Sequence, residues 1–177
     1  LVERGDRLGG QALNLFKTAD GTDVQKALAA LVEAASAHDK ISVYMNAEIT
    51  SVEGFVGNFK SIISSGDQET TLEHGVAVVA TGASPYQPDE YDYGQDPRII
   101  TSLDLDKKFM ADDPALAKIN SAVFIQCVGS REPERPYCSR VCCTHSIDSA
   151  LELKKRNPAM NVYILYRDIR TYGDRKS

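Results

Sequence analysis

The spacing of apolar residues changes along the first half of the chain, and each change predicts a new element. Between residues 23 and 38, apolar side chains recur three and four positions apart, which predicts an amphipathic helix. The period then shortens. Strands are expected at residues 41–45, 48–52, 59–64 and 70–73. The continuous apolar run 76–79 predicts a strand covered on both faces, as in a parallel sheet.

The second half begins with a segment rich in Pro, Tyr, Asp and Gly, residues 84–97, which predicts an ordered loop or linker. A short helix is expected at 102–110. After it the pattern is that of one strand–loop–helix–strand unit. Its parts are expected at residues 121–125, 126–142, 144–155 and 162–166. Strand and helix alternating at this length favour an α/β architecture with a small antiparallel sheet excursion, divided near residues 84–101.

Composition narrows the class of protein. The 177 residues are 42% hydrophobic and 25% charged, as in ordinary globular proteins, and the net charge of −5 is spread without a basic block. Nucleic acid is therefore not the expected partner. No stretch approaches the roughly 18 apolar residues of a membrane span, so direct membrane insertion is not expected. Because Leu1-Val2-Glu3 reads like the end of a buried strand, we interpret the sequence as an internal fragment.

Two groups of residues suggest a flavin site in the first half. Glu3 stands at a predicted strand end, where the acid of a dinucleotide-binding βαβ unit accepts hydrogen bonds from ribose hydroxyls. Gly9 and Gly10 would let the backbone pass close to the pyrophosphate. Thr81 and Gly82 follow the apolar run, as in the Ala-Thr-Gly that ends a parallel strand in flavoproteins with two dinucleotide-binding domains. An ordinary exit from a strand into a turn is the alternative.

The glycine-rich turn of a dinucleotide site, G-x-G-x-x-G, does not occur in the sequence. We expect it upstream of Leu1. Residues 1–83 would then be a partial FAD-binding domain without its first βα unit, followed by a linker at 84–101. Residues 102–177 would be a partial second Rossmann-like domain. The 177 residues alone are expected to bind FAD poorly and to be inactive.

The four cysteines form one constellation, C-x10-C-x3-C-C, within 17 residues. They are Cys127, Cys138, Cys142 and Cys143. They come from a strand end, a loop and a helix start, so their thiolates can converge on an iron–sulfur cubane. The helix N-terminus favours their negative charge, and so do the nearby arginines. The spacing indicates metal binding in a reducing compartment, hence a cytoplasmic location.

Two other uses of these cysteines remain open. Zinc accepts four thiolates, although zinc sites usually use C-x2–4-C pairs, which are absent here. Thiol redox chemistry is the second alternative. It lacks a C-x-x-C motif, and a disulfide between the adjacent Cys142 and Cys143 would be strained. At the level of function, these alternatives are a zinc-stapled, non-catalytic interaction module and an NAD(P)H-dependent disulfide reductase.

Several motifs resemble the heterodisulfide reductase A family, with the cysteine segment the most specific. The matching stretches are F-I-Q-C-V-G-S-R (124–131), R-P-Y-C-S-R-V-C-C-T-H (135–145), V-E-G-F-V-G-N-F (52–59), E-H-G (73–75), A-T-G-A (80–83) and L-Y-R-D-I-R-T-Y-G (165–173). The resemblance covers essentially the whole chain.

This resemblance implies a thioredoxin-reductase-like flavoprotein scaffold with FAD and 4Fe–4S clusters. The parent would be an electron-transfer oxidoreductase in a heterodisulfide-reductase-like or quinone-interacting complex, with other subunits as partners. Carried over by position, the four cysteines would ligate one cluster, and Glu3, Gly9, Gly10, Thr81 and Gly82 would line the FAD site. No side chain is assigned a catalytic role. A sheet edge left open by a missing strand would favour dimerisation.

Overall fold

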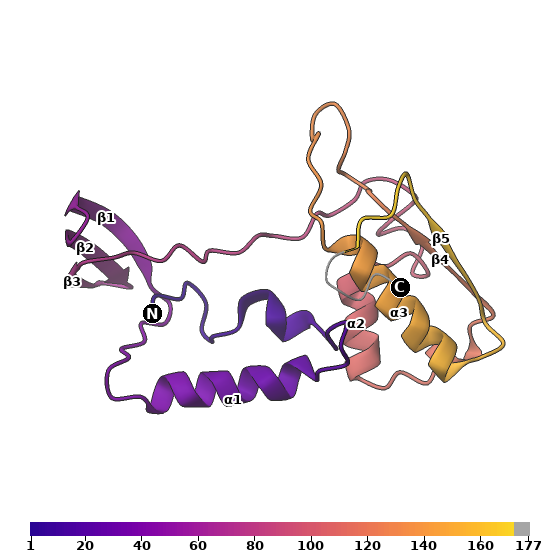
Figure 1. Ribbon diagram of the computed structural model, residues 1–177, viewed down its shortest axis with the longest axis horizontal. Helices are drawn as coiled ribbons and strands as arrows, with labels where there is room; N and C mark the ends of the chain where they lie inside the picture. Colours follow the sequence, from indigo (N-terminus) through magenta and orange to yellow (C-terminus); the bar gives the residue numbers. More distant parts are fainter. Residues whose placement is uncertain (172–177) are drawn as a thin grey trace. The chain divides into compact units, whose positions relative to one another are not determined.

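In the computed structural model, which describes residues 1–171, the chain forms two compact units. Unit 1 comprises residues 1–13 and 25–83, and unit 2 comprises residues 14–24 and the chain from residue 84 onward. In chain order (Figure 1) the elements are the 3-10 helix η1 (Gly10–Asn14), α1 (Val24–Ala37), β1 (Glu48–Phe55), β2 (Asn58–Ser65), β3 (Gln68–His74), α2 (Ser102–Met110), the 3-10 helix η2 (Leu116–Lys118), β4 (Ser121–Ile125), α3 (Cys142–Arg156) and β5 (Asn161–Leu165).

Unit 1 is built on a three-stranded antiparallel sheet in the order β1-β2-β3. Two tight turns join its strands. Gly54, near the end of β1, has a φ of +97°, and a Cβ there would lie 2.1 Å from the carbonyl oxygen of Asn58. Only glycine fits that close approach, so this residue fixes the β1–β2 hairpin. Helix α1 turns a stripe of partly buried residues inward, while Leu31 is 67% exposed.

Unit 2 contains a parallel pair, β4 and β5, connected through α3. Figure 1 shows α2 and α3 beside this pair. The buried core consists of Leu105, Phe109, Leu116, Leu153 and Met160. Further apolar residues pack against this core from the strands and from the segment before α1, namely Phe16, Ala122, Phe124 and Val162.

Helix α2 begins with a capping box. The Thr101 side chain accepts a hydrogen bond from the backbone N–H of Asp104, and the Asp104 side chain accepts one from the Thr101 backbone. These reciprocal bonds satisfy two backbone donors that a helix start otherwise leaves open, so the sequence defines this end sharply.

The predicted mixed α/β class with a small antiparallel sheet is confirmed. The strand–loop–helix–strand unit of the second half is found where the pattern placed it, with β4 and β5 parallel. The assignment of residues 1–83, 84–101 and 102–177 to a partial FAD-binding domain, a linker and a Rossmann-like domain stays a prediction.

Two predicted strands are wrong. Residues 76–79 form no strand, and Val78 and Val79 are 87% and 83% exposed. A strand is held by hydrogen bonds to a neighbour, and no strand within residues 1–171 pairs with this segment. Residues 41–45 contribute only a single bridge, between Val2 and Tyr44. An apolar run alone therefore did not suffice for either strand.

Candidate functional site

The four cysteines, hereafter the cysteine site, all lie in unit 2, between the end of β4 and the first turn of α3. The Gln126 N–H donates to the Leu165 carbonyl at 2.9 Å and extends the β4–β5 ladder by one residue. The chain then turns sharply, since Cys127, Gly129 and Arg131 all have φ between +60° and +66°. Left-handed conformation is unusual for residues other than glycine, so this loop is shaped by its surroundings.

An aromatic side chain from the preceding segment supports that loop. A Cβ built on Gly129 would lie 2.3 Å from the ring of Tyr86, so the ring rests directly on the glycine backbone. The guanidinium of Arg135 stacks over the same ring at 4.6 Å, in cation–π geometry. The Tyr86 hydroxyl donates to Glu90 at 3.2 Å. Residues 86–90 and the cysteine loop are thus packed together.

Cys142 and Cys143 are the first two residues of α3, and the preceding Val141 provides no side-chain cap. The first backbone N–H groups of a helix have no partner within it, and the helix dipole favours negative charge there. Nearby donors also face sulfur. The Ser139 hydroxyl lies 3.7 Å from the Cys142 sulfur, and the Arg140 N–H lies 3.3 Å from that of Cys138. This end of α3 therefore suits thiolates.

A buried ion pair holds the first turn of α3 against α2. His145 Nε2 lies 3.0 Å from Asp106 Oδ1, and the other carboxylate oxygen accepts from the Phe16 N–H at 3.1 Å. Asp106 is only 3% exposed. Hydrogen bonding to Asp106 raises the pKa of His145, against the effect of its burial. The pair fixes the helix turn that carries two of the cysteines.

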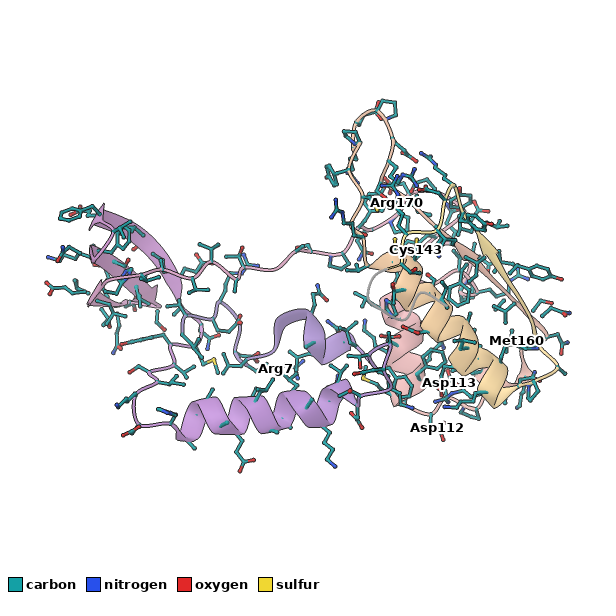
Figure 2. The ribbon with its side chains drawn as sticks, in the orientation of Figure 1. Arg7, Asp112, Asp113, Cys143, Met160 and Arg170 are labelled. Carbon is teal, nitrogen blue, oxygen red and sulfur yellow. The ribbon has the colours of Figure 1, made fainter. Side chains whose placement is uncertain are left out.

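Cys143 is buried and electrostatically coupled to its neighbours. Burial raises the pKa of its thiol, and negative charge at Cys142 and Cys127 acts in the same direction. A hydrogen bond from the backbone of Arg170 lowers that pKa. Figure 2 shows Cys143 at the start of α3 with Arg170 close by. Thiols that influence one another in this way share one site.

The donor set fits an iron–sulfur cluster in its chemistry. Four free thiols lie in one loop and helix start, with hydrogen-bond donors facing three of them. Within residues 1–171 the structure holds no three His, Cys, Asp or Glu side chains close enough together to hold a metal ion. The assignment of the four cysteines as ligands is therefore taken up as a proposal below.

The residues predicted for a flavin lie in unit 1. The Glu3 carboxylate accepts a hydrogen bond from the Gly5 N–H at 2.7 Å. Gly9 has a φ of +128°, and a Cβ on it would lie 2.9 Å from Leu28. Gly82 has a φ of +66° and open space around it.

One contact connects the two groups of flavin-side residues. The Gln11 side chain, just after Gly9 and Gly10, donates to the Ala83 carbonyl at 3.2 Å, just after Thr81 and Gly82. The largest cavity found among the described residues, about 430 Å³, lies elsewhere, on the antiparallel sheet. None of the predicted flavin residues lines it.

Sequence reasoning missed several residues that contact the cysteine site or hold its supporting elements. These are Tyr86, Asp106, Asp168 and Arg170. A signal existed for two of them, since Asp168 and Arg170 lie in the motif L-Y-R-D-I-R-T-Y-G. The last two residues of that motif, Tyr172 and Gly173, lie outside the described residues.

Comparison with known proteins gives a consistent set of relatives, all of them A-type components of heterodisulfide reductases. In Methanothermobacter thermautotrophicus the relative belongs to the H2:CoB–CoM heterodisulfide,ferredoxin reductase, and the identity is 37% over 120 residues, covering 60% of this chain and 18% of that protein. In Methanopyrus kandleri it is the second iron-sulfur component of this type of the CoB–CoM heterodisulfide reductase, with 35% identity over 124 residues, covering 60% and 19%. In Methanosarcina acetivorans it belongs to the ferredoxin/F420H2-dependent CoB–CoM heterodisulfide reductase, with 33% identity over 121 residues, covering 60% and 15%.

No family model matches the chain. Among solved structures, L-proline dehydrogenase from P. horikoshii aligns with a TM-score of 0.48 at 15% identity, covering 93% of this chain and 30% of that one. Within residues 1–171, no helix has the length and apolar character needed to cross a membrane.

The fold and the cysteine site define an α/β chain with thiols gathered at one helix start. Its curated relatives belong to the heterodisulfide reductase A family, and the chain is their homologue, as the motifs predicted. The chain spans about a fifth of the length of these relatives.

Proposed function

We propose that this chain is the cysteine-bearing part of an electron-transfer oxidoreductase of the heterodisulfide reductase A type. The observation that supports this most directly is the gathering of four thiols by one strand end and one helix start, with donors facing sulfur. When bound, a 4Fe–4S cluster exchanges single electrons and FAD exchanges one or two.

The four cysteines, Cys127, Cys138, Cys142 and Cys143, would supply the thiolate ligands of one cluster. The α3 N-terminus and the Ser139 hydroxyl would stabilise the negative charge of these ligands. Burial of Cys143, which is 4% exposed, would limit access of water to its side of the site.

In the longer parent protein, the flavin-side residues would contact FAD. Glu3 would accept hydrogen bonds from ribose hydroxyls, while Gly9, Gly10, Thr81 and Gly82 would leave room for the ligand against the backbone. The contact between Gln11 and Ala83 supports this grouping. We further propose other subunits of a heterodisulfide-reductase-like or quinone-interacting complex as partners, in the cytoplasm.

The first test is the content of iron, acid-labile sulfide and zinc per chain after anaerobic reconstitution, with visible and EPR spectra. About four iron and four sulfide per chain are expected for a cubane. Cys143→Ala should lose this uptake, whereas Ser139→Ala, which removes only a donor, should retain it. Stoichiometric zinc without iron would contradict the proposal and favour a zinc-stapled module.

The same preparations test the flavin assignment. FAD added to the 177-residue chain should bind weakly, because the sequence has no G-x-G-x-x-G turn to hold the pyrophosphate. Stoichiometric FAD on the purified chain would contradict that expectation. NAD(P)H-dependent disulfide reduction by the chain would favour the reductase alternative.

A further inference from the structure

The segment that follows β5 lies against the cysteine site and has a carboxylate at its centre. Asp168 binds two guanidinium groups at once. One oxygen, Oδ1, pairs with Arg131 Nη1, and the other, Oδ2, accepts from Arg170 Nε at 2.7 Å. Arg131 belongs to the cysteine loop and Arg170 to the segment after β5. The carboxylate therefore connects two separate parts of unit 2.

Both arginines also reach cysteines. Arg131 Nη1 lies 3.9 Å from the sulfur of Cys127. The backbone of Arg170 hydrogen-bonds Cys143. The hydrogen bond to Asp168 raises the pKa of the Arg170 guanidinium, and negative charge at Cys138 adds to this effect. Two positive charges are thus held beside three of the four thiols.

The backbone of the cysteine loop is anchored at the same place. Arg167, one residue before Asp168, donates from Nη1 to the carbonyl oxygen of Arg131, and its Nη2 lies 3.6 Å from Glu132. The Arg131 N–H donates to the Tyr137 carbonyl at 3.2 Å. Because Arg131 is fixed through its backbone, the contact with Asp168 has only the side chain left to orient.

We propose that Asp168 is a positioning residue that holds the side chains of Arg131 and Arg170 against the cysteine site, and that these two cations set the reduction potential of its cluster. This inference rests on the proposed function. Positive charge near an iron–sulfur cluster favours the reduced form, which carries one more negative charge, and so raises the potential. A carboxylate at the same distance would do the opposite by its charge alone.

The sign of a potential shift therefore tests the inference. Asp168→Ala removes a negative charge, which by charge alone would raise the cluster's midpoint potential. If Asp168 acts by holding two arginines, the released cations move into solvent and the potential falls. The midpoint is measured by EPR-monitored redox titration of the reconstituted protein, with iron and sulfide content determined in parallel. A downward shift at unchanged iron content is expected, with Asp168→Glu restoring part of it.

Matched variants complete the experiment. Arg131→Gln and Arg170→Gln should each lower the potential in the wild-type background and have smaller effects in Asp168→Ala, because the arginines are already released there. They also carry the test if Asp168→Ala does not fold. Asp112→Asn serves as the control, since Asp112 pairs with Arg156 at 2.7 Å, away from the cysteines, and should cause no shift.

An unchanged or raised potential in Asp168→Ala, or no decrease in both arginine variants, would overturn the inference while leaving the cluster in place. Wild-type protein that takes up zinc and no iron would overturn the proposed function itself, and the inference with it. Iron content of the wild type thus separates the two failures.

Discussion

Gly129 and Gly82 have the same backbone φ of +66°, yet their surroundings differ completely. Gly129 lies in the cysteine loop of unit 2, where a Cβ would meet the ring of Tyr86 at 2.3 Å. Gly82 lies on the flavin side of unit 1, where a Cβ would meet nothing within 4 Å. One predicted site is thus packed by its own unit, while the other is open.

The cores of the two units differ in the same way. The contiguous buried cluster, including Leu153 and Met160, belongs to unit 2. In unit 1 only Ala47 and Ile63 are buried apolar residues, and the run 76–79 is exposed. A site motif becomes an ordered site only where side chains of the same unit pack around it, and in this chain that holds for the cysteines.

The largest effect is expected from the core of unit 2. Leu153→Ala on α3 should lower the free energy of unfolding by about 2–5 kcal/mol, because Leu153 is 2% exposed and its removal leaves a cavity. Leu151→Ala on the same helix removes a side chain that is 64% exposed and should change stability by less than about 0.5 kcal/mol. Urea unfolding followed by circular dichroism measures both, and equal effects would contradict a packed unit 2.

The matched glycines give the next effect. Gly129→Ala should cost about 1–3 kcal/mol, since it combines a left-handed backbone with overlap against the Tyr86 ring. Gly82→Ala meets open space and should cost about 1 kcal/mol or less, from the backbone alone. Urea unfolding of both variants provides the comparison.

Removing the ring separates the two contributions at Gly129. In a Tyr86→Ala background, Gly129→Ala should lose the overlap and cost no more than Gly82→Ala. A Gly129→Ala effect that is unchanged without the ring would show that the backbone, and not packing, shapes the cysteine loop.

The success of sequence prediction follows this division. Helix 102–110 and strand 121–125 are found at the predicted bounds, since a capping box fixes the one and a parallel neighbour the other. The run 76–79 has strand composition but no partner strand among the described residues, so composition misled. Local signals predict an element well when its partners are nearby in the same unit.

The site shows the same limit. The cysteine spacing was visible in the sequence, and the structure places all four thiols at one loop and helix start. The side chains that contact the site or hold α3 in place come from distant positions, such as Tyr86, Asp106 and Asp168. No local period marks such residues, because their roles depend on contacts 37 or more residues away in the chain.

The smallest effect concerns the capping box of α2, which belongs to unit 2 alone. The hydrogen bond from Thr101, with help from Lys107, lowers the pKa of Asp104 below its usual 3.8. A carboxyl with a lowered folded-state pKa stabilises the fold above its unfolded value, and this stabilisation is lost as the pH falls through the folded value. Asp104→Asn should therefore cost about 0.5–2 kcal/mol near neutral pH, and the difference from wild type should shrink below about pH 4.

Urea unfolding of both proteins between pH 7 and about pH 3 would show this convergence. Thr101→Val removes the hydroxyl but keeps the carboxylate, so the pKa of Asp104 should move back toward its usual value and the pH dependence should weaken. A difference that stays constant with pH would mean that Asp104 acts through shape alone. Because the capping box lies wholly in unit 2, convergence in the measured transition would also show that this transition reports the unit that carries the cysteines.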